Sequence, residues 1–354
     1  MTGGPLHVVL VGPARFPVTP PYAGGLEAFI GTLARELRTR GHHVEVVAGV
    51  RPPAPRDDRR ADVPHDEDDL IADGEALRRE VERRVDRTTV LHLNAPSIEV
   101  LDLVDAVAHV EVTLHTPPLD HFARLCELRD RVGISTPSRS NAAQWSSRFD
   151  VDPAVIGNGV DRATFRPGAR RGAGLFWAGR LVPEKGAHLA IEAARLLEVP
   201  VRIAGPVHDQ QYFDDAVRPL LGRGATYLGH LRPDELARQM AGASATLVTP
   251  LWPEPFGLVV AESLACGTPV AAFANGALRG DGSGPFPPDV VITADRMDAQ
   301  ALAHAAIRAV GASRSRCRQA SREFDLIRTV ERYEQRYRAG STDPCATSSA
   351  STRR

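Results

Sequence analysis

Short apolar runs alternate with amphipathic stretches along nearly the whole chain. An apolar run at 6–11 is followed by a stretch at 27–40 with helical periodicity. In that stretch Phe29, Leu33 and Leu37 recur on one face, which is the pattern of a surface helix packed on a core. Repetition of this unit predicts an α/β protein with parallel sheets covered by helices.

Two sets of strands are expected. Residues in the first set are Leu6–Val11, Val44–Val50, Val90–Leu93, Val110–His115 and Val132–Thr136. Those in the second are Leu175–Ala178, Val201–Ala204, Ala225–Leu228, Ala245–Val248, Val270–Phe273 and Val290–Thr293. Two Rossmann-like domains facing each other across a cleft are the economical interpretation, with ligands beyond the carboxyl ends of the strands.

Turn-forming residues at 158–168 mark the junction between the domains. We therefore expect a first domain over residues 1–165 and a second over 166–321. Pro52–Asp69 combines prolines with charged runs and few large apolar residues, so it is predicted to be a mobile insertion. The small, polar residues 339–354 predict a disordered tail.

The composition is that of a globular protein: 354 residues, 43% apolar and 25% charged, with a net charge of −1. Because there is no excess of basic residues, nucleic acid is not an expected partner. The four cysteines form no C-x-x-C pair, and no apolar stretch approaches the roughly 20 residues that span a bilayer. A reduced, cytoplasmic protein without a structural metal is expected.

Two carboxylates, Glu254 and Glu262, are separated by seven residues. Prolines on both sides keep Glu254 on extended or turn backbone, whereas Glu262 falls on a short apolar helix that begins at Leu258. The start of a helix offers free N–H groups to a diphosphate. The candidate contacts for a nucleoside diphosphate are therefore Phe256, Gly257, Leu258 and Val259. Glu262 is placed to accept hydrogen bonds from the ribose hydroxyls of the same ligand.

A guanidinium and an ammonium follow the first strand of the second domain, in the segment Gly179-Arg180-Leu181-Val182-Pro183-Glu184-Lys185-Gly186. Together they could neutralise the charge that develops on a departing diphosphate.

In the first domain, Gly24 and Gly25 open the leading helix and allow a ligand to approach the backbone closely. His115 ends a strand and should point into the cleft, whereas His92 has the apolar flanks of a structural residue.

These segments resemble the motifs of the retaining glycosyltransferases of family 4, which have the GT-B architecture. The resemblance is carried by Glu254 to Glu262, by Gly179 to Gly186, and by the Gly-Gly-x-Glu loop at 24–27. It implies that Arg180 and Lys185 hold the diphosphate, and that Glu254 and His115 contact the transferred sugar. The amphipathic pattern around residues 322–338 predicts a long C-terminal helix, and the resemblance implies that this helix packs back on the first domain.

The activity that this resemblance implies is a retaining, metal-independent transfer of a sugar from a nucleoside-diphosphate donor, with a UDP-linked sugar favoured, to a hydroxyl of an unidentified acceptor. No cofactor is expected beyond the donor. Asp66-Glu67-Asp68 matches a metal-binding Asp-x-Asp, but its place in an acidic stretch favours a solvated charge run. The loop 275–284 departs from the family pattern, because it is longer and lacks a nearby glutamate.

Three other interpretations stay open. A nucleotide-sugar epimerase would share the two-domain cleft, and a catalytically silent sugar-nucleotide-binding partner would bind the donor without turnover. Contact with a membrane surface through Arg35, Arg38 and Arg40 is a weaker hypothesis. The sequence identifies neither the acceptor, the pathway nor the oligomeric state.

Overall fold

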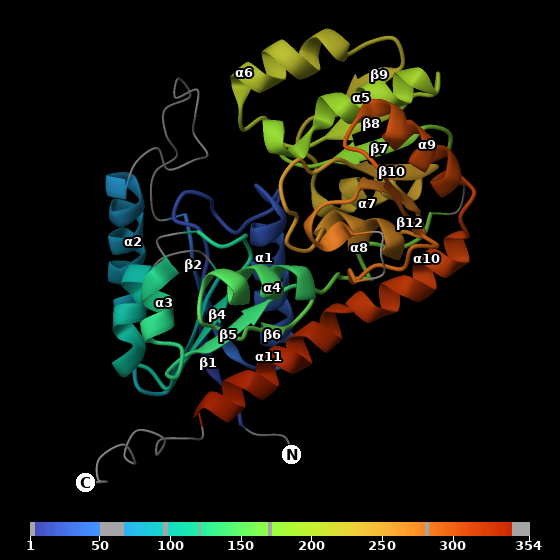
Figure 1. Ribbon diagram of the computed structural model, residues 1–354. Helices are drawn as coiled ribbons and strands as arrows, with labels where there is room; N and C mark the ends of the chain where they lie inside the picture. The colour runs from blue at the N-terminus through green and yellow to red at the C-terminus, as the bar shows by residue number, and fades with distance from the viewer. Residues whose placement is uncertain are drawn as a thin grey trace.

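The computed structural model describes residues 4–49, 67–94, 98–119, 122–168, 172–279 and 283–341. The chain forms two α/β domains, each built on a parallel six-stranded sheet with helices on both faces (Figure 1). The predicted fold class is therefore confirmed.

The first sheet has the strand order β2-β1-β3-β4-β5-β6. Its strands are β1 (His7–Val11), β2 (His43–Val47), β3 (Thr89–Leu93), β4 (His109–Thr113), β5 (Gly133–Thr136) and β6 (Ala154–Val155). The first five lie where the apolar runs predicted them. The edge strand β6 was not predicted, because its two residues carry no hydrophobic pattern.

The second sheet has the strand order β12-β11-β10-β7-β8-β9. Its strands are β7 (Leu175–Ala178), β8 (Val201–Ala204), β9 (Ala225–Tyr227), β10 (Ala245–Val248), β11 (Val270–Phe273) and β12 (Val291–Ala294). Each lies within one or two residues of its predicted position. These apolar strands are covered on both faces, as buried parallel strands require.

Helices cover both sheets and supply most of the connections. They are α1 (Gly25–Thr39), α2 (Glu67–Glu82), α3 (Ala123–Glu127), α4 (Arg139–Arg148), α5 (Ala187–Leu196), α6 (Gln210–Tyr212), α7 (Pro233–Ala241), α8 (Leu258–Ala265), α9 (Ala299–Val310), α10 (Arg314–Ala320) and α11 (Leu326–Ser341). In the described part of the chain, none of these helices combines the length and hydrophobicity needed to cross a bilayer.

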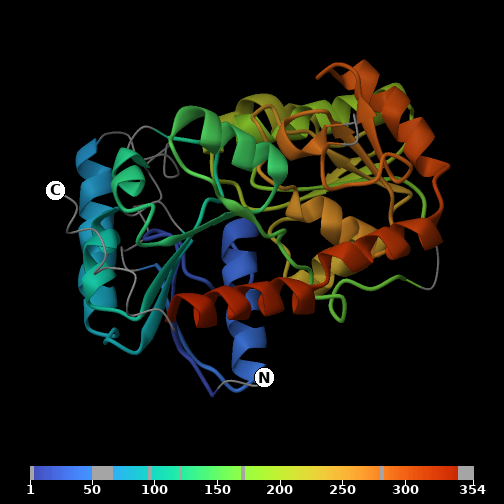
Figure 2. The same cartoon turned by 60° about the horizontal axis from the view of Figure 1, so that its bottom comes forward.

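The last helix, α11, leaves the second domain and packs on the first (Figures 1 and 2). Tyr333 and Tyr337 are fully buried there, in the same cluster as Val8, Leu10 and Phe29. At the solvent side, Glu334 lies 2.7 Å from Arg40 Nη1. The helix therefore ties the two domains together, alongside direct contacts such as the hydrogen bond from Ser138 Oγ to the Pro255 carbonyl.

Several predicted features lie wholly or partly outside the described residues. Most of Pro52–Asp69, including Asp66, is outside them, and the chain is helical from Glu67 onward in α2. Helix α11 continues to Ser341, and residues 342–354 are outside the described part.

Candidate active site

The candidate site lies where the order of strands in each sheet reverses direction. In the second sheet β7 is flanked by β8 and β10, so a crevice opens at the carboxyl ends of β7 and β10. Arg180 and Lys185 follow β7, and Glu254 follows β10. Parallel strands thus bring together groups that are about 70 residues apart in the sequence.

A cleft of about 470 Å³ lies between the two domains. All ten residues predicted from the sequence line it: Gly25, His115, Arg180, Lys185, Glu254, Phe256, Gly257, Leu258, Val259 and Glu262. The first two come from the first domain and the other eight from the second. A ligand in this cleft would therefore touch both domains.

Lys185 and Glu254 form an ion pair in the cleft, with 2.7 Å between Nζ and Oε2. The Lys185 ammonium also lies 4.8 Å from the centre of the Trp252 ring, within the range of a cation–π contact. Burial acts to raise the pKa of Glu254, but the Lys185 charge and hydrogen bonds outweigh it, so the pKa lies below its ordinary value. The pair therefore places one positive and one negative charge side by side.

The backbone around Lys185 is fixed by Thr249, at the end of β10. Thr249 Oγ1 donates to the carbonyl oxygens of Lys185 and Gly186, at 2.7 and 3.0 Å, and accepts from Trp177 Nε1 at 2.9 Å. Gly186 has a φ of 63°, and a Cβ there would lie 2.6 Å from the Thr249 carbonyl oxygen. This close approach requires glycine.

The backbone of Glu254 packs against the loop that begins at residue 275, which departs from the family pattern. Gly276 packs so closely that a Cβ would lie 2.3 Å from the backbone nitrogen and oxygen of Glu254. The N–H of Ala277 donates to the Glu254 carbonyl at 2.7 Å. The unusual loop therefore positions the carboxylate, although it contributes no acidic side chain of its own.

The amino ends of two helices meet across the cleft. Helix α8 begins after Gly257, which has a φ of 91°, and α1 begins at Gly25. A Cβ on Gly25 would lie 3.7 Å from the side chain of Leu258. The first N–H groups of a helix have no partner within it, and the helix dipole is positive there. This part of the cleft consequently favours an anion.

Arg180 reaches toward the first domain. Its Cδ would lie 3.7 Å from a Cβ on Gly24, and its Nη2 lies 3.9 Å from Glu184. It also faces Glu27, a nearly buried carboxylate on the first turn of α1. Burial raises the pKa of Glu27, and the positive charge of Arg180 opposes that effect. Glu27 therefore belongs to the cleft as well.

Glu262 lies one turn inside α8 with only 9% of its surface exposed. Burial raises the pKa of Glu262 to about 8. The side chain is therefore mainly protonated at neutral pH. In this form it can donate a hydrogen bond as well as accept one.

His115 follows β4 and lines the cleft, as the sequence predicted. Its Nε2 lies 3.2 Å from Asn94 Oδ1, and its ring packs against Phe29. Burial lowers the pKa of His115 to about 3, so the ring is neutral at physiological pH. With Nε2 donating to Asn94, Nδ1 is left as a hydrogen-bond acceptor.

His92 has the structural position that its apolar flanks predicted. It is fully buried, and its two ring nitrogens lie 2.7 Å from Tyr337 Oη and Thr113 Oγ1. Burial lowers the pKa of His92 to about 4. The residue joins α11 to the first sheet and does not line the cleft.

The three arginines proposed to meet a membrane all have partners within the protein. Arg35 pairs with Asp161 at 2.7 Å, Arg38 donates to the Val44 carbonyl, and Arg40 pairs with carboxylates of α1 and α11. Their charges thus serve packing and domain contacts, which weakens the membrane hypothesis.

Sequence reasoning missed the roles of Thr249, Gly276 and Trp252. The position of Thr249, directly after a predicted strand, was a usable signal. Gly276 gave none, because its contact with Glu254 depends on how two loops pack. The composition offered one further signal for the site, because Lys185 is the only lysine among the 43 Lys and Arg residues of the chain.

A cleft with these charges between two Rossmann-like domains is the architecture of the GT-B glycosyltransferases. The family model for glycosyl transferases group 1 matches residues 172–322, and that for glycosyltransferase family 4 matches residues 23–164. The two models together span most of both domains. The chain belongs to glycosyltransferase family 4 and is a sugar-transferring enzyme.

Individual relatives agree with this assignment. The phosphatidyl-myo-inositol mannosyltransferase of Mycobacterium tuberculosis is 28% identical over 280 residues, which are 70% of this chain and 74% of that protein. A glycosyltransferase of avilamycin A biosynthesis has a similar structure, with a TM-score of 0.66 and 24% identity over 95% of this chain and 98% of the other.

Another solved structure, HepE from Anabaena in complex with UDP and glucose, matches with a TM-score of 0.69 and 16% identity, over 94% of this chain and all of that one. At these identities the two structural likenesses concern the fold.

Proposed function

We propose that the protein is a retaining glycosyltransferase that takes a sugar from a nucleoside-diphosphate donor, with UDP as the favoured nucleotide, and passes it to a hydroxyl acceptor without a metal ion in the chemical step. The observation that carries the proposal is the Lys185–Glu254 pair, which lies in the same cleft as Arg180 and the start of α8.

In this proposal the diphosphate of the donor lies against the start of α8. The N–H groups of Leu258 and Val259 face one side of it, and Arg180 and Lys185 neutralise the other. Lys185 supplies a compact point charge and Arg180 a planar fork, so the two cations are not interchangeable. The backbone of Gly25 completes the contact from the first domain.

The sugar and the ribose are assigned to the two glutamates. Glu254, whose pKa is lowered by Lys185 against the effect of burial, accepts hydrogen bonds from hydroxyls of the transferred sugar. Glu262, one turn farther along α8, accepts the ribose hydroxyls. Neutral His115 contributes a ring nitrogen to the sugar from the opposite wall.

The reaction exchanges one bond to the anomeric carbon for another. The bond from this carbon to the departing phosphate oxygen breaks, and a bond from the acceptor oxygen forms on the same face of the sugar. The proton of the acceptor hydroxyl passes to the departing phosphate. Fixed cations beside that phosphate stabilise the charge as it develops and lower the barrier.

The preference for UDP has limited support, which makes the donor the first property to test. HepE, which shares the fold, was solved with UDP and glucose. A thermal-shift panel of UDP-, GDP-, ADP- and dTDP-linked sugars would rank the donors, because a ligand that binds the native state raises the melting temperature by mass action.

A chemical label gives an independent readout of the same site. Because Lys185 is the only lysine, an amine-reactive ester can modify only this side chain and the amino terminus. We expect the favoured donor to protect Lys185 from the label. Equal labelling with and without a saturating donor would contradict the diphosphate assignment. Donor isomerised in the absence of acceptor would indicate an epimerase, and protection without any transfer would indicate a binding partner.

A further inference from the structure

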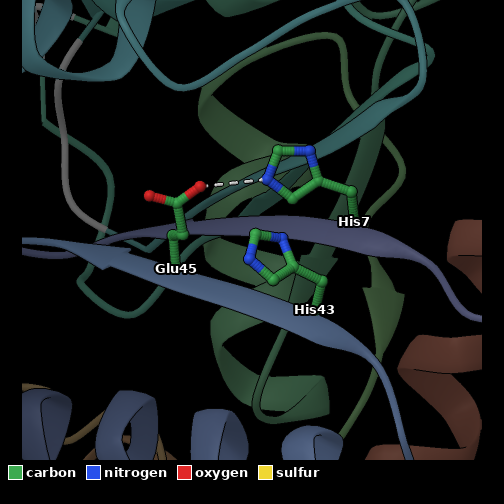
Figure 3. Close-up of side chains that lie close together, drawn as sticks. All are labelled: His7, His43 and Glu45. Atoms are coloured by element: carbon green, nitrogen blue, oxygen red, sulfur yellow. Dashed lines mark hydrogen bonds and ion pairs between the residues drawn. The ribbon is translucent and has the colours of Figure 1, made fainter.

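Three side chains with metal-binding atoms meet on the first sheet, at the end opposite the cleft. His7 is the first residue of β1, His43 is the first residue of the edge strand β2, and Glu45 follows on β2. Figure 3 shows the three side chains on the same face of the sheet. The cleft begins beyond the other end of β1, where Pro13 lines it.

The sheet itself brings these groups together. His7 and His43 are direct partners in the parallel register of β1 and β2. Glu45 lies two residues after His43 and so projects from the same face. Nε2 of His7 lies 3.1 Å from Oε1 of Glu45, and the two imidazole rings are 4.7 Å apart. One potential ligand atom from each residue lies within 4.8 Å of the other two.

His7 is oriented by groups behind it. Its Nδ1 lies 3.1 Å from Oγ1 of Thr89, a fully buried hydroxyl, which in turn lies 3.1 Å from Oδ1 of Asp86. With an ion in place of the Nε2 proton, Nδ1–H donates to Thr89, Thr89 donates to Asp86, and the Nε2 lone pair binds the ion. Such a partner on the far nitrogen is typical of metal-bound histidine.

The surroundings also suit an ion from solvent. His43 is exposed on an edge strand, so its ring can rotate inward to close the remaining gap. Arg84 lies 3.5 Å from Oε2 of Glu45 and thereby leaves Oε1 directed at His7. Two imidazoles and one carboxylate are a ligand set suited to zinc, with bonds of about 2.0–2.2 Å.

We propose that His7, His43 and Glu45 bind a late first-row divalent ion, zinc foremost, which clamps the edge strand β2 to β1. Solvent completes the coordination of the ion. The site is separate from the sugar-transfer cleft, so the ion stabilises the first domain and takes no part in the reaction.

The test uses the full-length chain without an affinity tag, stripped of metal by a chelator. Zinc is titrated against a chromophoric chelator, and the melting temperature is followed in parallel. We expect one ion per chain and a higher melting temperature with zinc. His43→Ala and Glu45→Gln should each weaken binding at least tenfold, and Thr89→Val about tenfold through the orientation of His7.

The matched control is His304→Ala, which removes an exposed histidine from α9 in the second domain. It should bind zinc as the unchanged chain does. His43→Ala is at the surface, and its melting temperature without zinc verifies that it folds. The proposal is overturned if His43→Ala binds zinc with unchanged affinity, if the His304 variant loses the ion, or if the unchanged chain binds none at micromolar zinc.

Discussion

The two walls of the cleft differ in how they present charge. The second domain contributes Arg180, Lys185 and Glu254, of which the last two are paired at 2.7 Å. The first domain contributes His115, which burial keeps neutral, the glycine backbone that opens α1, Glu27, whose pKa burial raises, and Arg35, whose charge is paired with Asp161. The difference suggests a division of labour, in which one wall stabilises a charged leaving group and the other selects hydroxyl groups by neutral hydrogen bonds.

The strongest test of this comparison is the removal of Lys185 from the wall formed by the second domain, which we call the charged wall. Lys185→Ala should lower kcat/KM by about 10²–10³-fold, the loss typical when a group that stabilises developing charge is deleted. Lys185→Arg should lose most of that activity too, because a planar guanidinium cannot replace a compact ammonium beside Glu254. Initial rates with the favoured donor would measure both effects.

Arg308→Ala, which removes an exposed cation on α9, is the control and should leave the rate unchanged. If Lys185→Ala stayed within tenfold of the unchanged enzyme, the charged wall would not be stabilising the leaving group, and the division of labour would be wrong.

The charged wall was largely predictable from the sequence, and its supports were not. Apolar runs located the strands that are four or more residues long. The carboxyl ends of parallel strands meet at one edge of the sheet, so Arg180, Lys185 and Glu254 could be expected to lie together. The contact of Gly276 with Glu254 depends on two loops that follow neighbouring strands. Nothing in the local pattern of either loop encodes it.

The attachment of α11 illustrates the same limit on a larger scale. Its amphipathic pattern predicted a helix, but the hydrogen bond between Tyr337 and His92 joins residues 245 positions apart. The apolar flanks of His92 indicated burial without indicating a partner. Local patterns thus determine elements, whereas polar pairs in the core depend on the packed arrangement of both domains.

The buried acid of the second domain gives the next largest effect, on stability. The pKa of Glu262 is raised from 4.5 to about 8 in the folded protein, so the native state keeps a proton that the unfolded chain releases. The free energy of unfolding should therefore fall as pH rises from about 4.5 to about 8, by at most about 1.4 kcal/mol per pH unit from this group. Above this window its contribution levels off.

Glu262→Gln isolates this contribution, because all other titrating groups remain in both proteins. Urea unfolding at pH 5.5, 7 and 8.5 should show that the variant gains stability relative to the unchanged chain as pH rises. Parallel pH dependences would mean that Glu262 has an ordinary pKa and that solvent reaches it freely.

The neutral wall should give the smallest effect, and a different kind of effect. His115→Ala should reduce the transfer rate about tenfold, the value of one hydrogen bond between neutral groups. Because the pKa of His115 is about 3, the ring carries no charge between pH 5.5 and 8.5. The ratio of the two rates should then stay constant across that range, as pH–rate profiles of the two enzymes would measure. A ratio that changed near pH 6.5 would show that His115 acts as a charged group, and the two walls would no longer differ in the way the comparison requires.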